Sequence, residues 1–263
     1  MSYRFPHIDG IPLKKQFGQH FLRDQNIIDN MISYVSITPE TSVFEIGCGD
    51  GVLTSALLKT PLARLWVFEI DSEWARYVRK KYPDARMTIF EENILEVDFS
   101  RFEPHKPWTL CANLPYQITM PLLMLLQRNR ALLREGVIMI QEEVAQKLTQ
   151  TSGRGYGFIS LFFQHYFELK LHDKIKPQSF FPPPAVDSRL VYFKPRFAEP
   201  IEQEELFWKW IKACFKQPRR TLRNNLASLH YPLNKIPQDI LNLRAQQMDK
   251  KQLLELWHTI INS

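Results

Sequence analysis

Cysteine is scarce in this sequence, and the few cysteines fit neither a disulfide framework nor a metal site. There are three, Cys48, Cys111 and Cys214, so their number is odd, and they lie far apart. No Cys-x-x-Cys or mixed Cys/His spacing typical of zinc ligands occurs. We therefore expect reduced thiols in a cytosolic protein and no bound metal.

Long apolar runs are also missing. The N-terminal segment is rich in charged residues and contains no apolar core of a signal peptide. The longest apolar stretch near the middle of the chain, residues 122–126, is far too short to span a membrane. No internal repeat or low-complexity tract is present. These absences predict a cytoplasmic protein that makes no contact with a membrane.

Size and charge leave several functions open. With 263 residues, of which 44% are hydrophobic, the chain can form one large domain or a medium domain with a small one. The formal net charge is +6. A basic balance of this size is compatible with nucleic-acid binding but does not decide it, because many basic proteins bind no nucleic acid.

Short apolar runs alternate with helical patterns in the first part of the chain. One helical pattern begins at Val52, Asp71 is the expected N-cap of a second that reaches residue 80, and a third covers residues 142–148. This alternation predicts an α/β fold, with a mostly parallel sheet and helices on both faces. The expected strands are residues 43–46, 65–68, 87–90, 108–112 and 136–140.

The pattern changes after residue 157. Residues 158–175 are rich in Phe, Tyr and Leu and alternate partly after His165, which indicates a strand region, and residues 188–193 form one more expected strand. The run 180–184, Phe-Phe-Pro-Pro-Pro, can be neither strand interior nor helix. Two closing strands would give the sheet an antiparallel end. Beyond residue 195 the apolar spacing is helical, so we expect a domain of residues 1–196 and a small helical domain of residues 197–263.

A glycine-rich loop and a distant acid predict a nucleoside-type ligand. Gly47, Gly49 and Gly51 follow the first expected strand in the order G-x-G-x-G, which differs from the dinucleotide pattern G-x-G-x-x-G. Glu69 ends the next strand about twenty residues later, where an acid can accept both hydroxyls of a ribose. A structural turn with a surface acid is the alternative. An NAD enzyme is disfavoured by the glycine spacing and by the lack of an evident hydride-acceptor site.

The tetrapeptide Asn113-Leu114-Pro115-Tyr116 follows the fourth expected strand. Pro115 fixes its own φ angle and restricts Leu114, so the Asn113 side-chain oxygen and the Leu114 carbonyl can lie side by side. Two neighbouring acceptors match the two N–H bonds of an amino group on an aromatic ring, and Tyr116 can stack on that ring. A plain surface turn is the alternative. With the glycine loop upstream, we interpret the tetrapeptide as the acceptor site of a methyltransferase.

These segments resemble the ribosomal RNA adenine N6,N6-dimethyltransferases, most closely the bacterial small-subunit members. The similarity runs from Gln16 to about Leu226, and the order and spacing of its pieces make it specific. The pieces are 16–22 (Gln-Phe-Gly-Gln-His-Phe-Leu), 44–49 (Phe-Glu-Ile-Gly-Cys-Gly), 113–116, 141–145 (Gln-Glu-Glu-Val-Ala), 156–160 (Tyr-Gly-Phe-Ile-Ser), 182–188 (Pro-Pro-Pro-Ala-Val-Asp-Ser) and 219–226 (Arg-Arg-Thr-Leu-Arg-Asn-Asn-Leu).

The resemblance implies a Rossmann-like methyltransferase domain and a helical C-terminal domain. It implies S-adenosylmethionine as the methyl donor and two adjacent adenosines in a hairpin loop of small-subunit (16S) rRNA as the substrate. It places Gly47 under the methionine part of the donor and Glu69 on its ribose. Phe180 becomes the partner of Tyr116 in a sandwich around the target adenine. The implied donor-binding residues are His20, Leu22, Gly47, Gly49, Glu69, Ile70, Asn93, Ile94 and Asn113, and the implied catalytic residues are Asn113, Leu114, Pro115, Tyr116 and Phe180.

Three positions depart from the family pattern. Asn93 stands where the family usually has an Asp that accepts from the adenine amino group of the donor, although an Asn oxygen can still accept that bond. Glu142 stands where family members often have Lys, so one positive charge expected near the RNA is missing. A basic run that usually reads Arg-Arg-Lys is Pro-Arg-Arg here, at residues 218–220.

Residues 208–225 carry positive charges and no acid. A solvated helix face is the alternative, but the single sign of the charges and the flanking aromatics favour RNA contact. We expect the loop 153–157 to be mobile and to touch the substrate, and we expect His165 and His172 to be packed or surface residues rather than ligands. The expected RNA-binding residues are Lys216, Arg219, Arg220 and Arg223.

The predicted function is dimethylation of N6 on two adjacent adenosines of the small ribosomal subunit or its precursor, by a monomer. A non-catalytic ribosome-assembly factor is the alternative from another class. Two enzymes also compete: an antibiotic-resistance relative that acts on large-subunit rRNA, and a DNA adenine methyltransferase. Leu114 and the run 221–226 favour the small-subunit type.

Overall fold

The computed structural model describes residues 6–197, 199–229 and 231–262. Contacts between Cα positions group them into two compact units. The first contains the described residues up to Ala145 together with Glu168–Pro195, and the second contains Gln146–Phe167 and the described residues from Arg196 onward. The second unit therefore includes residues 146–167, which the predicted ranges had put in the domain of residues 1–196.

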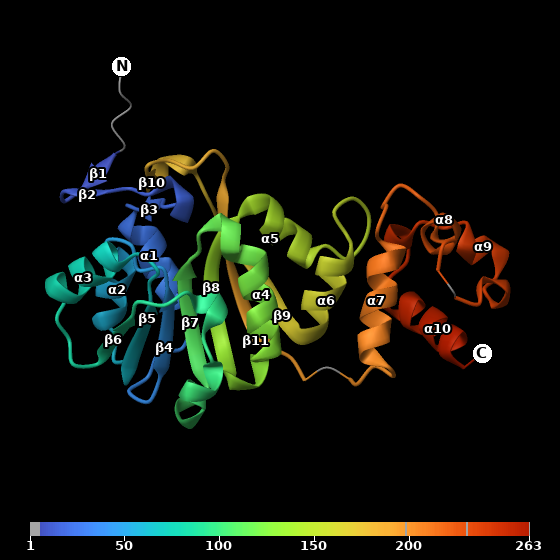
Figure 1. The fold of residues 1–263 in the computed structure, drawn as a ribbon, viewed down its shortest axis with the longest axis horizontal. Coiled ribbons are helices and arrows are strands. Elements are labelled where there is room, and N and C mark those ends of the chain that lie inside the picture. The colour runs from blue at the N-terminus through green and yellow to red at the C-terminus, as the bar shows by residue number, and fades with distance from the viewer. Residues whose placement is uncertain (1–5, 198, 230, 263) are drawn as a thin grey trace, which may run out of the picture. The chain divides into compact units, whose positions relative to one another are not determined.

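A seven-stranded sheet forms the centre of the first unit (Figure 1). Its strand order is β6-β5-β4-β7-β8-β11-β9. The strands from β6 to β8 pair in parallel, and β11 pairs with β8 antiparallel, so the predicted fold class is confirmed. The strands are β4 (Ser42–Ile46), β5 (Arg64–Phe68), β6 (Met87–Phe90), β7 (Trp108–Asn113), β8 (Leu133–Gln141), β9 (Phe167–Ile175) and β11 (Ser188–Pro195).

Helices connect the parallel strands. Asp71 caps α3 as predicted, because its side chain accepts a hydrogen bond from the amide of Glu73 at 3.1 Å. The helices are α1 (Gln25–Ser33), α2 (Val52–Leu58), α3 (Ser72–Lys81), α4 (Thr119–Arg128) and α5 (Glu142–Thr149). The 3₁₀ helices are η1 (Lys15–Phe17), η2 (Ile94–Glu96), η3 (Phe99–His105), η4 (Tyr116–Ile118), η5 (Arg130–Leu132), η6 (Pro177–Ser179), η7 (Leu233–Lys235) and η8 (Ala245–Gln247).

Alternation along the strands divides the core between the two faces of the sheet. On one face, Val43 and Leu65 of the strands belong to a cluster with Met31 of α1 and Leu57 of α2. On the other face, the ring of Phe44 lies between 4.4 and 5.4 Å, centroid to centroid, from Trp66, Phe68, Phe102 and Trp108. Because both faces are covered, the loops at the strand ends are the part of the sheet that remains available to a ligand.

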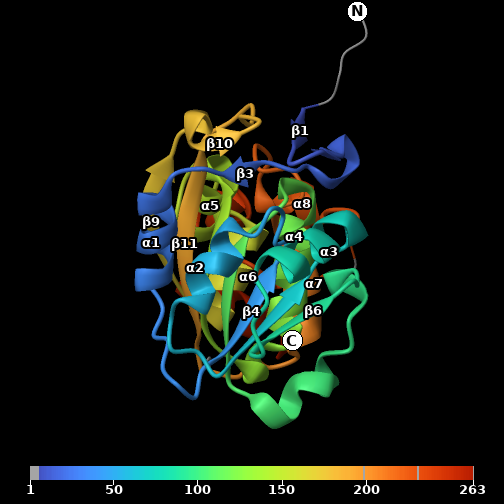
Figure 2. The same cartoon turned by 90° about the vertical axis from the view of Figure 1, so that its left-hand side faces the viewer.

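Two small strand pairs lie beside the main sheet. β1 (His7–Ile8) pairs with β2 (Ile11–Pro12), and β3 (Phe21–Leu22) pairs with β10 (Phe180–Phe181), both antiparallel. Figure 2 shows β3 and β10 side by side. In register, Leu22 lies opposite Phe180. A segment near the N-terminus is therefore joined to the segment that carries Phe180.

The second unit is helical, and it corrects one prediction. Residues 158–166 form helix α6 instead of part of a strand region, and the strand β9 begins only at Phe167. No residue of α6 is exposed, and only Ser160, Gln164 and His165 among its residues are polar, so the sequence marks the helical period weakly. Across the described chain, no helix has the length and apolar content needed to cross a bilayer. The helices are α6 (Phe158–Tyr166), α7 (Glu204–Cys214), α8 (Leu222–Leu226), α9 (Gln238–Leu241) and α10 (Lys250–Ile261).

Candidate functional site

A pocket in the first unit lies at the carboxyl ends of β4, β5 and β7. The strand order reverses between β4 and β7, and open α/β sheets bind ligands at such a point. The structure brings all the predicted donor and acceptor residues into the lining of this pocket, whereas the predicted RNA-binding residues belong to the second unit. Those in the lining are His20, Leu22, Gly47, Gly49, Glu69, Ile70, Asn93, Ile94, Asn113, Leu114, Pro115, Tyr116 and Phe180.

The glycine loop after β4 brings the backbone close to the pocket. Gly47 and Gly49 have φ angles of +74° and +52°, which residues with side chains rarely adopt. A Cβ atom on Gly49 would lie 2.5 Å from Cε1 of Phe21, so a side chain there would displace the segment above the loop. A Cβ atom on Gly47 would come no closer than 3.8 Å to Pro115. Glycine at position 47 therefore keeps space open between the loop and the tetrapeptide.

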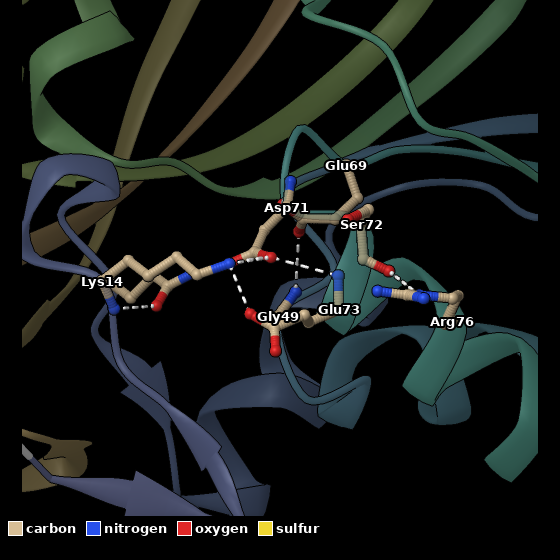
Figure 3. Close-up of polar contacts among 8 residues, drawn as sticks. Lys14, Gly49, Glu69, Asp71, Ser72, Glu73 and Arg76 are labelled. Carbon is tan, nitrogen blue, oxygen red and sulfur yellow. Dashed lines mark hydrogen bonds and ion pairs between the residues drawn. The ribbon is translucent and has the colours of Figure 1, made fainter.

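Glu69 lies directly after β5, buried against the glycine loop (Figure 3). Its Oε2 accepts a hydrogen bond from the amide of Gly49 at 3.1 Å, and its Oε1 accepts one from the amide of Asp71 at 2.9 Å. Burial raises the pKa of Glu69 above its ordinary value. A carboxylate has about four lone-pair sites. Sγ of Cys48 also donates to Oε2 at 3.7 Å, so about one acceptor site of Glu69, on Oε1, remains for a hydroxyl group of a ligand.

The first two residues of the tetrapeptide use hydrogen-bond donors for folding and keep two acceptors unpaired. Nδ2 of Asn113 donates to the carbonyl oxygen of His20 at 3.1 Å, and the amide of Leu114 donates to the carbonyl oxygen of Met139 at 3.2 Å. Among the described residues, neither Oδ1 of Asn113 nor the carbonyl oxygen of Leu114 accepts a hydrogen bond. Two unpaired acceptors therefore lie on consecutive residues of the pocket lining.

Two aromatic rings complete this end of the pocket. The hydroxyl of Tyr116 and Oγ of Ser188 are 2.6 Å apart, which fixes the tyrosine ring to the start of β11. Burial raises the pKa of Tyr116, so its phenol stays protonated near neutral pH. Phe180 on β10 is only 4% exposed and lines the same pocket. The tyrosine ring is partly buried and the phenylalanine ring is buried, and both line the pocket where a flat ring could stack.

Comparison with known proteins agrees with this geometry. The model of a family described as "Ribosomal RNA adenine dimethylase" matches residues 11–262. The chain belongs to this family. It is 33% identical over 251 residues to the "Ribosomal RNA small subunit methyltransferase A" of Chlorobium phaeobacteroides, which covers 95% of this chain and 92% of that protein. The protein of the same name from Prosthecochloris aestuarii is 34% identical over 90% of this chain and 89% of its own.

Solved structures show the same fold. A dimethyladenosine transferase from Plasmodium falciparum superposes with a TM-score of 0.76 at 24% identity, covering 90% of this chain and 96% of that one. The 23S rRNA methyltransferase ErmE superposes with a TM-score of 0.72 at 21% identity, covering 92% and 99%. Family membership confirms the predicted class of reaction, which is S-adenosylmethionine-dependent dimethylation of adenine in ribosomal RNA.

The structure gives a physical account of Asn93, the first departure from the family pattern. Asn93 is the N-cap of η2: its Oδ1 accepts from the amide of Leu95 at 3.2 Å, and its Nδ2 donates to Oε1 of Glu96 at 2.8 Å. An Asp at this position would place two carboxylates in contact. The Asn93 carboxamide can donate a hydrogen bond to Glu96, whereas a carboxylate at position 93 would repel it.

Glu142, the second departure, is held by Arg189. Nη2 of Arg189 donates to Oε1 of Glu142 at 2.9 Å, its Nε donates to Oε2, and its Nη1 donates to the carbonyl oxygen of His172 at 2.9 Å. The pairing is bidentate and charge-assisted. The negative charge of Glu142 is therefore compensated within the first unit.

The basic run of the second unit divides into side chains that contact a partner among the described residues and side chains that form no ion pair there. Lys209 forms an ion pair with Glu205 at 2.7 Å, and Nζ of Lys212 lies 4.7 Å from the ring centre of Phe158. Arg223 donates to Gln238. The side chains of the remaining predicted RNA-binding residues are exposed and have no ion pair among the described residues; these are Lys216, Arg219 and Arg220.

Two features beside the pocket were not predicted. Glu45 on β4 is fully buried; Thr54 lies next to it, but that contact falls short of hydrogen-bond geometry, and burial raises the pKa of Glu45 to about 8.

The second feature is an ion pair, in which Nζ of Lys14 contacts Oδ1 of Asp71 at 2.7 Å. The sequence shows Lys14 only as part of a lysine pair and Asp71 only as a helix cap, so nothing in it links the two.

Proposed function

We propose that this chain transfers methyl groups from S-adenosylmethionine to N6 of two adjacent adenosines in a hairpin loop of small-subunit rRNA, acting as a monomer in the cytoplasm. The observation that carries the proposal is the pair of unpaired acceptors, Oδ1 of Asn113 and the carbonyl oxygen of Leu114, at the pocket where the strand order reverses. The names of the two bacterial relatives support the choice of the small subunit.

The acceptor side would act by holding and orienting the amino group. S-adenosylmethionine, when bound, supplies an electrophilic methyl group on a sulfonium. Oδ1 of Asn113 and the carbonyl oxygen of Leu114 can each accept a hydrogen bond from the amino group of an unmodified adenine. These two hydrogen bonds favour a pyramidal nitrogen with an available lone pair. Tyr116 and Phe180 would hold the ring between them. Such positioning can supply a large part of the rate enhancement.

No general base is required of the protein. The alkylated nitrogen is acidic enough to lose its proton to water. Tyr116 is not suited to take that proton as a phenolate, because burial raises its pKa. After the first methyl transfer only one N–H remains, so one of the two acceptors is released and the pocket must hold the methyl already present.

The donor side would rest on backbone approach and on one acid. Gly47 keeps space beside Pro115, and Oε1 of Glu69 keeps an acceptor site that fits a ribose hydroxyl. These features fit the donor that the family uses. The other donor contacts proposed are His20, Leu22, Gly49, Ile70, Asn93, Ile94 and Asn113, all in the pocket lining.

The RNA would be held in part by the second unit. Lys216, Arg219 and Arg220 are exposed, one-signed and unpaired among the described residues, as phosphate contacts require. Arg223, which contacts Gln238, is the fourth proposed contact. We propose that residues 1–196 carry catalysis and that residues 197–263 contribute RNA binding.

The substrate proposal is tested by offering unmethylated small subunits, large subunits and DNA to the chain with labelled donor. Label should enter adenine of the small-subunit rRNA as dimethyladenosine. Label in the large subunit alone would refute the substrate. Binding of small subunits without any affinity for S-adenosylmethionine would identify a non-catalytic assembly factor instead.

A further inference from the structure

A segment near the N-terminus crosses the pocket proposed for the donor. Residues 16–22 contribute to the pocket lining. The segment has an apolar anchor at each end, because Leu13 and Phe21 both pack against Trp74 of α3, with the rings of Phe21 and Trp74 5.0 Å apart. None of residues 14–20, between the anchors, is buried. Polar contacts must therefore hold this middle part in place.

Two of these polar contacts converge on Asp71, and a third joins the segment to itself. Nζ of Lys14 donates to Oδ1 of Asp71 at 2.7 Å, and Nε2 of Gln19 donates to Oδ2 at 3.1 Å. The amide of Lys14 donates to Oε1 of Gln19 at 2.8 Å, which closes the segment into a loop. The Asp71 side chain has 0% exposure. A buried carboxylate requires a compensating charge and donors, and this segment supplies them.

Asp71 in turn holds the acid proposed for the ribose. Its amide donates to Oε1 of Glu69 at 2.9 Å, while the amide of Gly49 donates to Oε2 at 3.1 Å (Figure 3). Glu73 lies 2.6 Å from Nζ of Lys14 on the other side. Lys14 is thus a cation in contact with two acids, one of which directly positions Glu69. Hydrogen bonds to Asp71 and then to Glu73 raise the pKa of Lys14 and keep it charged.

We propose that Lys14 is a positioning residue for the methyl donor: its ion pair with Asp71 holds residues 14–20 across the pocket and keeps the Asp71 amide on Glu69. The inference rests on the proposed function, because it takes this pocket as the donor site. Lys14 itself is not part of the pocket lining, so it acts through its neighbours. Without the ion pair the apolar anchors keep the fold, but the middle of the segment opens more often and the donor leaves faster.

The test measures how fast labelled S-adenosylmethionine dissociates from the full-length chain when excess unlabelled donor is added. Lys14→Met keeps the apolar stem and removes the charge, and it should speed dissociation about tenfold, the factor for a contact worth ~1.4 kcal/mol. Lys14→Arg should restore a rate near that of the wild type. Lys15→Met is the matched control, because Lys15 is exposed and its side chain forms no ion pair with an acid within the described residues.

Two further measurements separate an ion pair from a general structural role. In an Asp71→Asn background, Lys14→Met should add little, since the pair is already broken. Salt should speed dissociation from the wild type but not from Lys14→Met, because Lys14 is 30% exposed and its ion pair is partly screened. If Lys14→Met does not fold, the salt dependence of donor dissociation from the wild type is the test: faster dissociation at higher salt supports the inference, and an unchanged rate contradicts it.

Equal dissociation rates for Lys14→Met and Lys15→Met, with both variants folded by circular dichroism, would overturn the inference while leaving the proposed function intact. Additive effects of Lys14→Met and Asp71→Asn would also overturn it. A wild-type chain that binds no donor would instead remove the proposed function, and this inference with it.

Discussion

Nδ2 of Asn113 donates a hydrogen bond to the carbonyl oxygen of His20 at 3.1 Å. This contact joins the tetrapeptide at the end of β7 to the segment that precedes β3. A carboxamide whose nitrogen is engaged in this way has a fixed orientation, and its oxygen is left as an acceptor. The backbone of the N-terminal segment therefore determines which end of the Asn113 side chain is available in the pocket.

Removal of the Asn113 carboxamide should abolish methyl transfer. Asn113→Ala loses the oxygen proposed to hold the amino group, and loss of one such positioned hydrogen-bonding group costs about two to three orders of magnitude in rate. RNA binding should stay nearly unchanged. Methyl incorporation and filter binding on the same RNA check both parts, and full activity of Asn113→Ala would refute the mechanism.

A charge change at position 93 should weaken the donor site. Asn93→Asp would place a carboxylate against Glu96, which now accepts from Nδ2 of Asn93 at 2.8 Å. We expect donor affinity to fall several-fold, roughly the 1 kcal/mol scale of one lost hydrogen bond. The double variant Asn93→Asp/Glu96→Gln should regain the affinity. Calorimetric titration with S-adenosylmethionine measures both, and an unrescued double variant would contradict the account given for Asn93.

The buried Glu45 should make stability fall as pH rises. Its pKa is about 8 in the folded protein against 4.5 for the ordinary group. A raised carboxyl pKa contributes stability below the ordinary value and loses it as pH rises toward the folded value. Unfolding free energy should therefore decline by up to about 1.4 kcal/mol per pH unit from this group across that window.

Glu45→Gln removes this titration and keeps the shape of the side chain. The difference in Tm between Glu45→Gln and the wild type should grow in favour of the variant from pH 5 to pH 8, as measured by thermal unfolding. A difference that stays constant over this range would show that Glu45 does not titrate there.

Exposed arginines of the second unit should contribute a salt-dependent part of RNA affinity. The double variant Arg219→Ala/Arg220→Ala removes two candidate phosphate contacts, so the slope of log K against log salt should flatten by about 1.4 to 1.8. Donor affinity should not change. Lys209→Ala is the control, because Lys209 is already paired with Glu205 at 2.7 Å. An unchanged slope in the double variant would exclude these arginines from the RNA interface.

Much of the fold followed from local pattern. The apolar runs and the glycines predicted the parallel strands, because a buried strand and a tight turn each leave a mark on neighbouring residues. Helix α6 is not predicted because none of its side chains is exposed and its few polar residues mark the helical period only weakly. The grouping of residues 146–167 with the second unit depends on long-range contacts that no local pattern contains.

The predicted donor and acceptor residues all lie in the pocket lining, but the contacts that hold them in place could not be predicted. The motifs placed Gly47, Glu69 and Asn113 at strand ends, which parallel pairing brings to one edge of the sheet. The link between Lys14 and Asp71 joins positions 57 residues apart, and the link between Arg189 and Glu142 joins positions 47 apart. Such pairs are set by tertiary geometry, so a single sequence carries no signal for them.

The pairing of β3 with β10 joins the proposed donor site to the proposed adenine site. Leu22, proposed for the donor, lies in register with Phe180, proposed for the adenine. A movement of Leu22 that releases the spent donor will also displace Phe180, the residue proposed to stack on the adenine. We therefore expect the enzyme to work distributively. Each exchange of spent donor for fresh donor should weaken the enzyme's contacts with the adenine, so RNA carrying singly methylated adenosine should be released and accumulate before the second methyl is added.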